Sequence, residues 1–409
     1  MRHLIILNHQ PDIPPFMVSQ ILYAKDHYGR VSYVNTRRPV NASLFDACEN
    51  VSFHYPGRLG RIAASVVACL RFFGPMNLKQ AWAQIREQGL DFSYLKQLFL
   101  FLASDACTRP LAGRLIRQGT GTDSVTVLST WFGACAVTAA RLKRRWPQIR
   151  AFSMAHSFEI LVSRNRFLPY LFNPFKFNYL DGVVFIAEKM REAYFEGVGK
   201  LDPACRDKTH VCYLGSYKDP DTLNPQPSDV FHICTCSRVI PLKRLDLLCK
   251  ALRNWKGGRI RWTHLGDGEM MDTLRSLSEE TMRENPNVEI VLKGQQANDE
   301  VKAFYASVPI DLFCNLSTIE GLPISIMEAV SYGIPVMATN VGGTSEIVDS
   351  GIGVLLDADI NAERVRDALL SFSQLPEIRK ALMREAAYAR WQDRFDAQKN
   401  LSHFFELIQ

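Results

Sequence analysis

The sequence predicts two α/β domains, each with a doubly wound, largely parallel sheet. Short apolar stretches, such as residues 4–7 and 231–236, alternate with helical stretches along the whole chain, a pattern typical of parallel sheets covered by helices. At 409 residues the chain also exceeds what one hydrophobic core usually holds. Three prolines within residues 218–227 indicate an irregular connection. We therefore expect one domain at residues 1–212 and a second that begins at residue 213.

The first domain opens with an apolar strand at Leu4–Leu7 and a proline-rich loop. A helix is expected at about residues 17–26, a strand at 31–34, and further alternation as far as a strand at 151–154. That last strand leads into His156, in a loop at the carboxyl edge of the sheet, where open α/β folds bind ligands. A single histidine is more often structural, and its position after a strand is what makes His156 a candidate.

The second domain carries cations after its first strand. Strand 231–236 leads to Arg238, and Lys243 follows at the expected start of the next helix. A planar guanidinium and a compact ammonium suit the oxygens of a diphosphate. As isolated residues they would be ordinary surface cations. A later strand, 288–292, ends in Lys293-Gly294-Gln295.

The most informative stretch runs from Ser317 to Val348. It predicts a loop, a helix, a buried strand and a second helix start, with Glu320 in the loop and Glu328 in the first helix. At about 1.5 Å per helical residue, this spacing spreads the two carboxylates over roughly 10 Å, so one extended polar ligand could meet both. The free N–H groups at the helix start favour an anion. The alternative is that both glutamates are solvated helix-end charges.

This stretch resembles the retaining glycosyltransferases of family four (glycosyltransferases group 1), which have the GT-B fold. In that family a Glu, seven residues and a second Glu mark the sugar-nucleotide site, and the resemblance covers about 30 consecutive residues, including Gly342-Gly343. It implies two Rossmann-like domains facing across a cleft. Residues 1–212 would bind the acceptor and residues 213–391 the nucleotide-sugar donor. A C-terminal helix at 392–409 would pack back on the first domain.

The resemblance also implies roles for individual residues. Arg238 and Lys243 would hold the donor diphosphate, Glu320 the sugar hydroxyls and Glu328 the ribose. Backbone near Gly294 would meet the base, and His156 would face the donor sugar. The expected donor site comprises Arg238, Lys243, Gly294, Gln295, Glu320, Gly321, Leu322, Pro323, Ile324 and Glu328, and catalytic roles fall to His156, Arg238, Lys243 and Glu320. Because cations do the work of a divalent ion in such enzymes, no metal or other cofactor is expected.

Charge is unevenly distributed along the chain. Residues 1–215 carry 27 Lys/Arg against 15 Asp/Glu, whereas residues 216–409 carry 21 against 27. The window 57–118 alone has nine basic residues against three acidic ones, in stretches with the pattern of amphipathic helices. We expect peripheral attachment to an anionic membrane surface, or else helices packed on their own sheet with solvated arginines. No nucleic-acid-binding motif is present, so nucleic acid is not expected as a partner.

Cysteine usage and hydropathy indicate the compartment. The ten cysteines lie mostly in apolar stretches without a C-x-x-C pair, which predicts buried thiols rather than metal sites or disulfides. The N-terminal apolar stretch is short for a signal peptide, and no stretch approaches the roughly 20 residues of a spanning helix. We expect a cytoplasmic protein at the inner face of the cytoplasmic membrane.

The sequence therefore predicts a retaining glycosyltransferase. It would move a sugar from a nucleoside-diphosphate sugar to a hydroxyl acceptor, such as a lipid-linked or cell-envelope polysaccharide intermediate of capsule, O-antigen or exopolysaccharide synthesis. Two alternatives stay open: a sugar-nucleotide epimerase of the GT-B fold, and a non-catalytic, membrane-attached binding protein.

Overall fold

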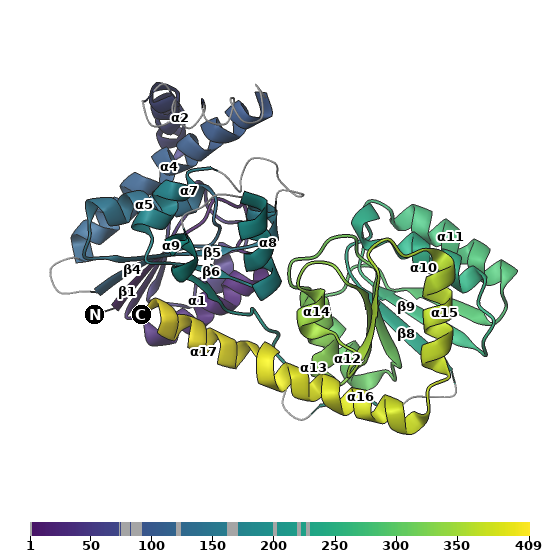
Figure 1. Cartoon of the computed structure of the whole chain (residues 1–409). Coiled ribbons are helices and arrows are strands. Elements are labelled where there is room, and N and C mark those ends of the chain that lie inside the picture. The colour runs from purple at the N-terminus through teal and green to yellow at the C-terminus, as the bar shows by residue number, and fades with distance from the viewer. Residues whose placement is uncertain are drawn as a thin grey trace. The chain divides into compact units, whose positions relative to one another are not determined.

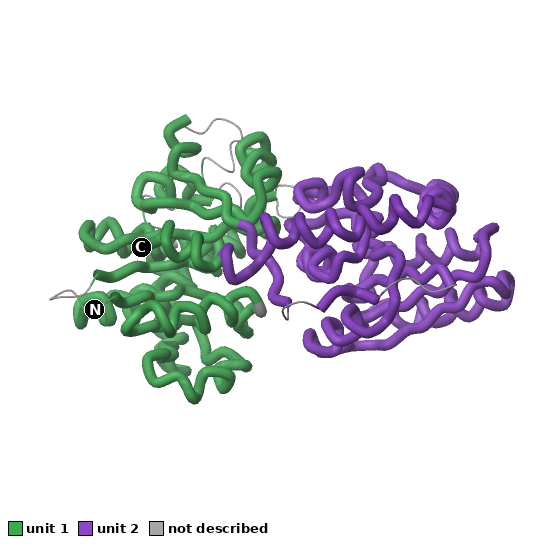
Figure 2. Tube along the Cα trace, turned by 90° about the horizontal axis from the view of Figure 1, so that it is seen from below, with its two compact units in different colours: residues 1–212, 401–409 green, residues 213–400 purple. Residues whose placement is uncertain are grey.

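The computed structural model describes residues 2–72, 92–119, 124–161, 171–198, 203–218, 222–225 and 230–409, together with residues 74 and 82. The chain divides into two compact units (Figure 2): unit 1 comprises residues 1–212 and 401–409, and unit 2 comprises residues 213–400. Each unit contains one parallel sheet with helices on both faces (Figure 1). The prediction of two doubly wound α/β domains is confirmed.

The sheet of unit 1 has seven strands among the described residues, in the order β3-β2-β1-β4-β5-β6-β7. All neighbouring strands are parallel. The order reverses direction between β1 and β4, which creates the switch point where doubly wound sheets bind ligands. The strands are β1 (Arg2–Leu7), β2 (Arg30–Val34), β3 (Val51–His54), β4 (Ser124–Ser129), β5 (Arg150–Ala155), β6 (Gly182–Phe185) and β7 (Thr209–Val211).

Helices α4, α5 and α7 cover one face of this sheet and α1 lies on the other (Figure 1). Helix α1 begins at Pro15, two residues earlier than expected, because proline is tolerated where its missing N–H has no intrahelical partner. The helices of unit 1 are α1 (Pro15–His27), α2 (Arg58–Phe72), α4 (Phe92–Gly119), α5 (Ala134–Arg145), α6 (Ser157–Ile160), α7 (Asn173–Tyr179), α8 (Glu188–Val198) and α9 (Ala204–Asp207), with a 3-10 turn at Ala42–Phe45.

The sheet of unit 2 has six parallel strands, in the order β10-β9-β8-β11-β12-β13. Its switch point lies between β8 and β11, directly before the two loops that the sequence singled out. The strands are β8 (Phe231–Cys236), β9 (Ile260–Leu265), β10 (Val288–Leu292), β11 (Leu312–Asn315), β12 (Val336–Thr339) and β13 (Gly353–Leu356).

Helices α10, α11 and α15 cover one face of the second sheet, and α12, α13 and α14 cover the other (Figure 1). The helices are α10 (Leu245–Arg253), α11 (Met271–Glu284), α12 (Asn298–Ser307), α13 (Ile324–Ser331), α14 (Thr344–Ile347), α15 (Ala362–Ser373) and α16 (Glu377–Arg390), with a 3-10 turn at Pro241–Lys243 and a π-helical turn at Trp391–Phe395. The last helix, α17 (Ala397–Ile408), runs across the division, since Leu401–Gln409 belong to unit 1. There Phe405 stacks on Tyr23 of α1, with ring centroids 5.1 Å apart.

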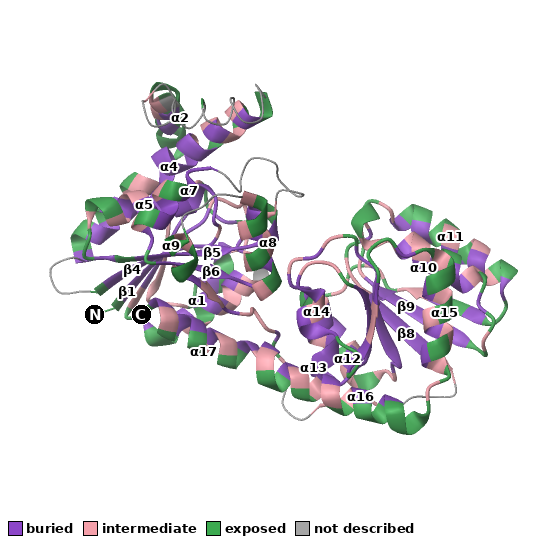
Figure 3. Cartoon of the chain, viewed as in Figure 1, coloured by how far each residue is buried: buried purple, intermediate pink, exposed green. Residues whose placement is uncertain are grey.

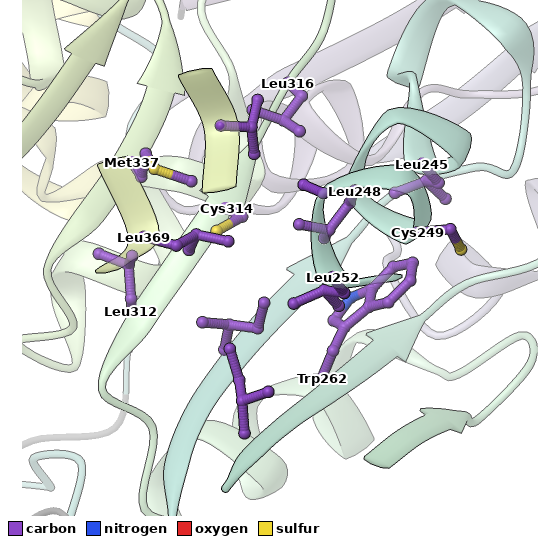
Figure 4. Packing of buried hydrophobic residues seen from close by; sticks show 14 of the residues in the cluster. Leu245, Leu248, Cys249, Leu252, Trp262, Leu312, Cys314, Leu316, Met337 and Leu369 are labelled. Atoms are coloured by element: carbon purple, nitrogen blue, oxygen red, sulfur yellow. The ribbon is translucent and has the colours of Figure 1, made fainter. Parts of the chain in front are cut away.

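The inner strands of each sheet are buried because helices cover both of its faces, whereas the edge strand β3 is only half-buried (Figure 3). In unit 2 the α10 side chains Leu245, Leu248 and Leu252 pack beside Trp262 of β9 (Figure 4). The Trp262 indole N–H is satisfied within this core, where it donates to the Thr235 hydroxyl at 2.8 Å. Each fully buried large apolar side chain contributes roughly 1.5–3 kcal/mol, so this packing holds the loops at the strand ends on a rigid base.

None of the ten cysteines, all of which lie among the described residues, forms a disulfide. Six are buried, as predicted: Cys107, Cys135, Cys212, Cys234, Cys249 and Cys314. The prediction of a buried thiol is wrong for Cys69, which is exposed on α2. Among the helices that the structure describes, none is both long and apolar enough to span a bilayer.

Candidate functional site

The loop after β8 presents Arg238 at the carboxyl edge of the second sheet. Its path is set by the turn after β9, where Gly266 has φ +135° and a Cβ would lie 1.9 Å from the Ser237 carbonyl oxygen. The Val239 N–H donates to the Asp267 carbonyl at 3.0 Å, which fastens the two loops together. Arg238 is exposed, and its guanidinium has no hydrogen-bond partner among the described residues. The structure therefore leaves this cation available to a ligand.

Lys243 and Glu320 form an ion pair beside that loop. The Lys243 Nζ lies 2.5 Å from Glu320 Oε1, and the two side chains are 22% and 11% exposed. The Asn315 amide also donates to Glu320 Oε1, at 3.3 Å. Main-chain contacts join the two segments as well, since the Thr318 N–H donates to the Leu242 carbonyl at 2.9 Å. The structure brings together these two residues, which lie 77 positions apart in the sequence.

Lys243 does not open a helix, contrary to the expectation. It ends a 3-10 turn, and Arg244 adopts the left-handed conformation, φ 50°, before α10 begins. The Arg244 guanidinium donates to the carbonyl of Leu316 at 2.5 Å and to that of Ala358 at 2.8 Å. Sequence reasoning missed this role because nothing in the pattern distinguishes Arg244 from the neighbouring lysine. Arg244 ties the Lys243 turn to the loop after β11.

The Gly342-Gly343 pair supports Glu320 from the other side. Gly342 has φ +55°, and a Cβ there would lie 2.0 Å from the Glu320 carbonyl oxygen. The Gly343 N–H donates to the Gly321 carbonyl at 2.7 Å. The close approach requires glycine at position 342, because any side chain would displace the Glu320–Gly321 turn.

Helix α13 begins directly after this turn. Leu322 and Pro323 are buried, whereas Ile324 is exposed and Ser325 half-buried. Pro323 precedes the helix without a side-chain cap, and the first N–H groups of any helix have no partner within it. The positive end of the helix dipole is thus directed past Glu320 and favours an anion.

Glu328 lies in the second turn of α13, apart from the Lys243–Glu320 pair. Its Oε1 accepts a hydrogen bond from the Asn298 amide at 2.7 Å. Burial raises the pKa of Glu328, while Asn298 and Lys302 oppose the shift. Burial also raises the pKa of the Cys236 thiol to about 12, with Glu328 adding to the shift and Lys243 opposing it. The charges of Glu328 and Lys243 therefore both act on the thiol of Cys236, which ends β8.

Gly294 and Gln295 lie in the loop after β10. Gly294 has φ +69°, no heavy atom lies within 4 Å of where its Cβ would be, and its carbonyl accepts from the Gly266 N–H at 2.9 Å. Gln295 is exposed and donates to the Gln296 carbonyl at 3.3 Å. The loops after β10, β9, β8 and β11 thus follow one another along the same edge of the sheet.

The sequence contains two Asp-x-Asp stretches, at residues 219–221 and 357–359, whose carboxylates are possible metal ligands and which the metal-free expectation did not take into account. Residues 219–221 lie outside the described residues. In the other stretch, Asp357 pairs with Arg364 at 3.3 Å on an exposed surface. Within the described ranges, no three His, Cys, Asp or Glu side chains are grouped so that they could hold one ion.

His156 lies in unit 1, whereas the other candidate residues lie in unit 2. It follows β5 and is 7% exposed, with its ring near those of Phe16 and Trp131 at centroid distances of 4.8 and 4.7 Å. Its Nε2 has no hydrogen-bond partner in the described part of the chain. Burial lowers the pKa of His156 to about 4, although the backbone of Thr130 opposes the shift. The imidazole is consequently neutral at physiological pH.

Two buried ionisable residues next to His156 were not predicted. Glu159 accepts from the backbone N–H groups of Phe132 and His156, at 3.0 and 3.2 Å, and burial raises its pKa to about 7. Lys176 donates to the Phe132 carbonyl at 3.0 Å, and burial lowers its pKa to about 7. Glu159 lies three residues after His156, the residue that precedes α6. This is the spacing of a capping box, which is the sequence signal that could have identified Glu159.

Both the matching family model and two similar proteins concern glycosyltransferases. Residues 223–390 match the model of the family described as "Glycosyl transferases group 1". The putative colanic acid biosynthesis glycosyltransferase WcaL of Escherichia coli is 28% identical over 180 residues, covering 42% of this chain and 43% of that protein. The amylovoran biosynthesis glycosyltransferase AmsK of Erwinia amylovora is 25% identical over 178 residues, 41% of this chain and 42% of that protein. The chain thus spans less than half the length of these relatives.

Solved structures match over the whole chain. Anabaena Alr3699/HepE in complex with UDP superposes with a TM-score of 0.70 at 16% identity, covering 100% of this chain and 99% of that one. The lipopolysaccharide outer core galactosyltransferase WaaB, in its apo form, gives a TM-score of 0.69 at 12% identity, again with 100% and 99% coverage. At these identities the likeness concerns the fold, which is GT-B, as the family resemblance implied.

We predict that His156 stays neutral well below neutral pH. Its folded pKa of about 4 lies below the ordinary value of 6.5, so between these values the unfolded chain binds the additional proton and stability falls as the pH is lowered. An NMR titration of the imidazole, with His156→Gln to assign its signal, should show no midpoint above about pH 5. A midpoint near the ordinary value would contradict the burial argument.

Proposed function

We propose that the chain transfers a sugar from a nucleoside diphosphate to an acceptor hydroxyl, because residues 223–390 match the model of the glycosyl transferases group 1 family. The observation that carries this proposal is the Lys243–Glu320 pair, held at 2.5 Å at the start of α13. A cation, an acid and a helix N-terminus at one strand edge suit a ligand with both a diphosphate and sugar hydroxyls.

The proposed chemistry stabilises the leaving group. When the bond between sugar and diphosphate breaks, negative charge develops on the phosphate oxygens. Arg238, Lys243 and the first N–H groups of α13 would stabilise that charge, and Lys243 would do so with little reorganisation because Glu320 already holds it. Glu320 accepts hydrogen bonds from the sugar hydroxyls, since its carboxylate is oriented by Asn315 and Lys243.

We further propose retention of the anomeric configuration, as the family resemblance implies. The acceptor hydroxyl attacks from the face that the diphosphate leaves, and the departing phosphate oxygen takes its proton. No side-chain base is then needed. Glu328 would bind the ribose, whereas backbone around Gly294 and Gln295 would contact the base. His156 would face the donor sugar as a neutral hydrogen-bonding group, which its low pKa supports.

The proposed acceptor is a lipid-linked or cell-envelope polysaccharide intermediate. Relatives named for colanic acid and amylovoran biosynthesis support this class. Structural neighbours in complex with UDP and with UDP-glucose support a nucleotide-sugar donor. Attachment to an anionic membrane surface would bring the enzyme to such an acceptor.

Helix α2 supports membrane attachment. Leu59, Ile62, Val66 and Leu70 are 82%, 55%, 55% and 72% exposed, and their spacing of three, four and four residues puts them on one helix face. Arg58 and Arg61 add positive charge at the start of the helix. An exposed apolar stripe with flanking arginines is suited to the interface of an anionic bilayer.

We predict that Arg238→Ala, Lys243→Ala and Glu320→Gln each lower kcat on the order of a hundredfold or more, because each removes stabilisation of the departing diphosphate or its sugar. The measurement is release of nucleoside diphosphate with candidate sugar nucleotides and an acceptor extract. Lys250→Ala is the matched control, since Lys250 also forms an ion pair, with Asp246 at 2.9 Å, but on the exposed surface of α10. Wild-type turnover in folded Lys243→Ala protein would refute the assignment.

We also predict that turnover does not require a divalent cation, because Lys243 and Arg238 supply the charge that would otherwise come from a metal. Activity after dialysis against EDTA should stay within about twofold of the untreated enzyme. Complete loss of turnover, restored by Mg²⁺ or Mn²⁺, would refute the metal-free mechanism while leaving sugar transfer intact.

Removal of the apolar stripe should weaken membrane binding. We expect Leu59→Ser/Leu70→Ser to lower binding to phosphatidylglycerol-containing vesicles by about tenfold, because two large apolar side chains no longer enter the bilayer. Val40→Ser/Leu44→Ser is the control, since these side chains are 80% and 60% exposed elsewhere in unit 1. Equal flotation of both variants, or no vesicle binding by the wild type, would rule out the stripe as the attachment site.

A further inference from the structure

Unit 1 contains a hollow of about 780 Å³ lined by seven arginines. They come from three helices: Arg71 from α2; Arg109, Arg114 and Arg117 from α4; and Arg141, Arg144 and Arg145 from α5. No acidic residue appears among its described lining residues. Such a concentration of one charge is costly without a counter-charge.

A buried carboxylate organises part of this set. Asp105 of α4 is fully buried, and Arg71, Arg109 and Arg141 lie within 3.3, 3.6 and 2.6 Å of its Oδ2. The Thr138 hydroxyl donates to the other oxygen at 3.1 Å. One negative charge thus fixes three guanidinium groups and leaves an excess of positive charge.

The other four arginines have no such partner. Arg114, Arg117, Arg144 and Arg145 are exposed, and none of them forms an ion pair with a carboxylate in the described part of the chain. Burial lowers the pKa of Arg109, and Arg71, Arg141 and Arg145 lower it further, whereas Asp105 raises it. Among the described lining residues the hollow therefore carries an excess of positive charge that no carboxylate balances.

Part of the lining of the hollow is apolar. Leu142, Trp146 and Phe175 contribute to its lining. Gly113 allows α4 to approach the Trp146 indole, since a Cβ there would lie 3.1 Å from the ring. Arg145 lies over the same ring, 5.1 Å from its centroid. Forked guanidinium groups match phosphate oxygens well.

The hollow lies away from the ligand edge of its own sheet. Helix α5 starts after the carboxyl end of β4 and ends before β5 begins (Figure 1), so its last turn lies near the amino ends of the parallel strands. Arg141, Arg144 and Arg145 all lie in that last part of α5. Doubly wound folds bind substrates at the opposite edge, and the hollow is therefore not the acceptor site expected of unit 1.

We propose that this arginine hollow binds a ligand with clustered phosphates, either the headgroup of an anionic lipid or a soluble polyphosphate. Its excess charge exceeds what a single carboxylate or a single phosphate monoester would balance. The inference does not depend on the proposed sugar transfer, because it rests on groups in unit 1 that the transfer mechanism does not use.

The test is calorimetric titration of the full chain with sodium tripolyphosphate. Arg114→Gln/Arg145→Gln removes two exposed lining charges and leaves the Asp105 cluster intact, and it should weaken binding by tenfold or more. Arg38→Gln/Lys96→Gln removes two exposed charges of unit 1 outside both the hollow and the apolar stripe of α2, and it should stay within about twofold of the wild type. Arg114→Lys/Arg145→Lys, which keeps the charge, should recover part of the affinity. Thermal unfolding of each variant verifies that it is folded.

Tripolyphosphate could also enter the proposed donor site, so the titration is repeated with Lys243→Ala. Binding that persists in Lys243→Ala and is lost in the Arg114/Arg145 double variant supports the hollow. Absence of binding by the wild type, or equal affinity in the hollow variant and its control, overturns the proposal.

A second arm identifies the source of the phosphates. The wild type and both double variants are floated with phosphatidylcholine vesicles that contain cardiolipin, a lipid with two phosphates. Flotation that the hollow variant loses and tripolyphosphate displaces assigns the hollow to a lipid headgroup. Tripolyphosphate affinity without such displacement assigns it to a soluble ligand, and either result supports a phosphate site.

Discussion

Parallel pairing of β8 with both β9 and β11 is the constraint on which the candidate site depends. It brings the carboxyl ends of these strands to one edge, so loops separated by tens of residues meet there. Arg238 follows β8 and Glu320 follows β11 for this reason. The buried helix layers fix the positions of the strands, and the strands in turn fix where the loops at their ends lie.

The Lys243–Glu320 ion pair at that edge is stabilised by its hydrogen bonds as well as by the attraction between the two charges. A partly buried ion pair loses hydration, and its attraction repays that loss only when further hydrogen bonds satisfy the charges. Asn315 supplies such a bond to Glu320. The Arg244 guanidinium donates to backbone carbonyls instead of to Glu320. Lys243 is therefore the cation that meets the acid, and its remaining N–H donors can reach a phosphate.

Much of this arrangement could be predicted from the sequence. Alternating apolar stretches with short loops determine a parallel sheet covered by helices, and the spacing of Glu320 and Glu328 around a helix start is a local property. Arg238 was predicted because it follows a strand, and Lys243 because it lies near the expected start of the next helix. The sequence also located the basic character of residues 57–118, part of which lies outside the described residues.

The features that were not predicted arise from tertiary contacts. The left-handed conformation of Arg244 depends on carbonyls of two distant loops, so propensity alone predicts a helix start two residues too early. The pKa values of Glu159 and Lys176 shift because both side chains are buried around Phe132, which sequence separation does not reveal. Cys69 is exposed although its neighbours are apolar, because α2 turns a whole apolar face outward.

The Lys243 site of unit 2 and the arginine hollow of unit 1 both contain cations, but they differ in how many carboxylates neutralise them. Of the two cations proposed to hold the diphosphate in unit 2, Lys243 is matched by Glu320 and only Arg238 lacks a partner among the described residues. The proposed diphosphate would therefore be held mainly by directed hydrogen bonds. In unit 1 one carboxylate faces three arginines while four more lack an acidic partner among the described residues. The phosphate binding proposed there would depend on excess charge and should weaken steeply with salt, whereas the donor binding proposed beside Lys243 would depend mainly on geometry.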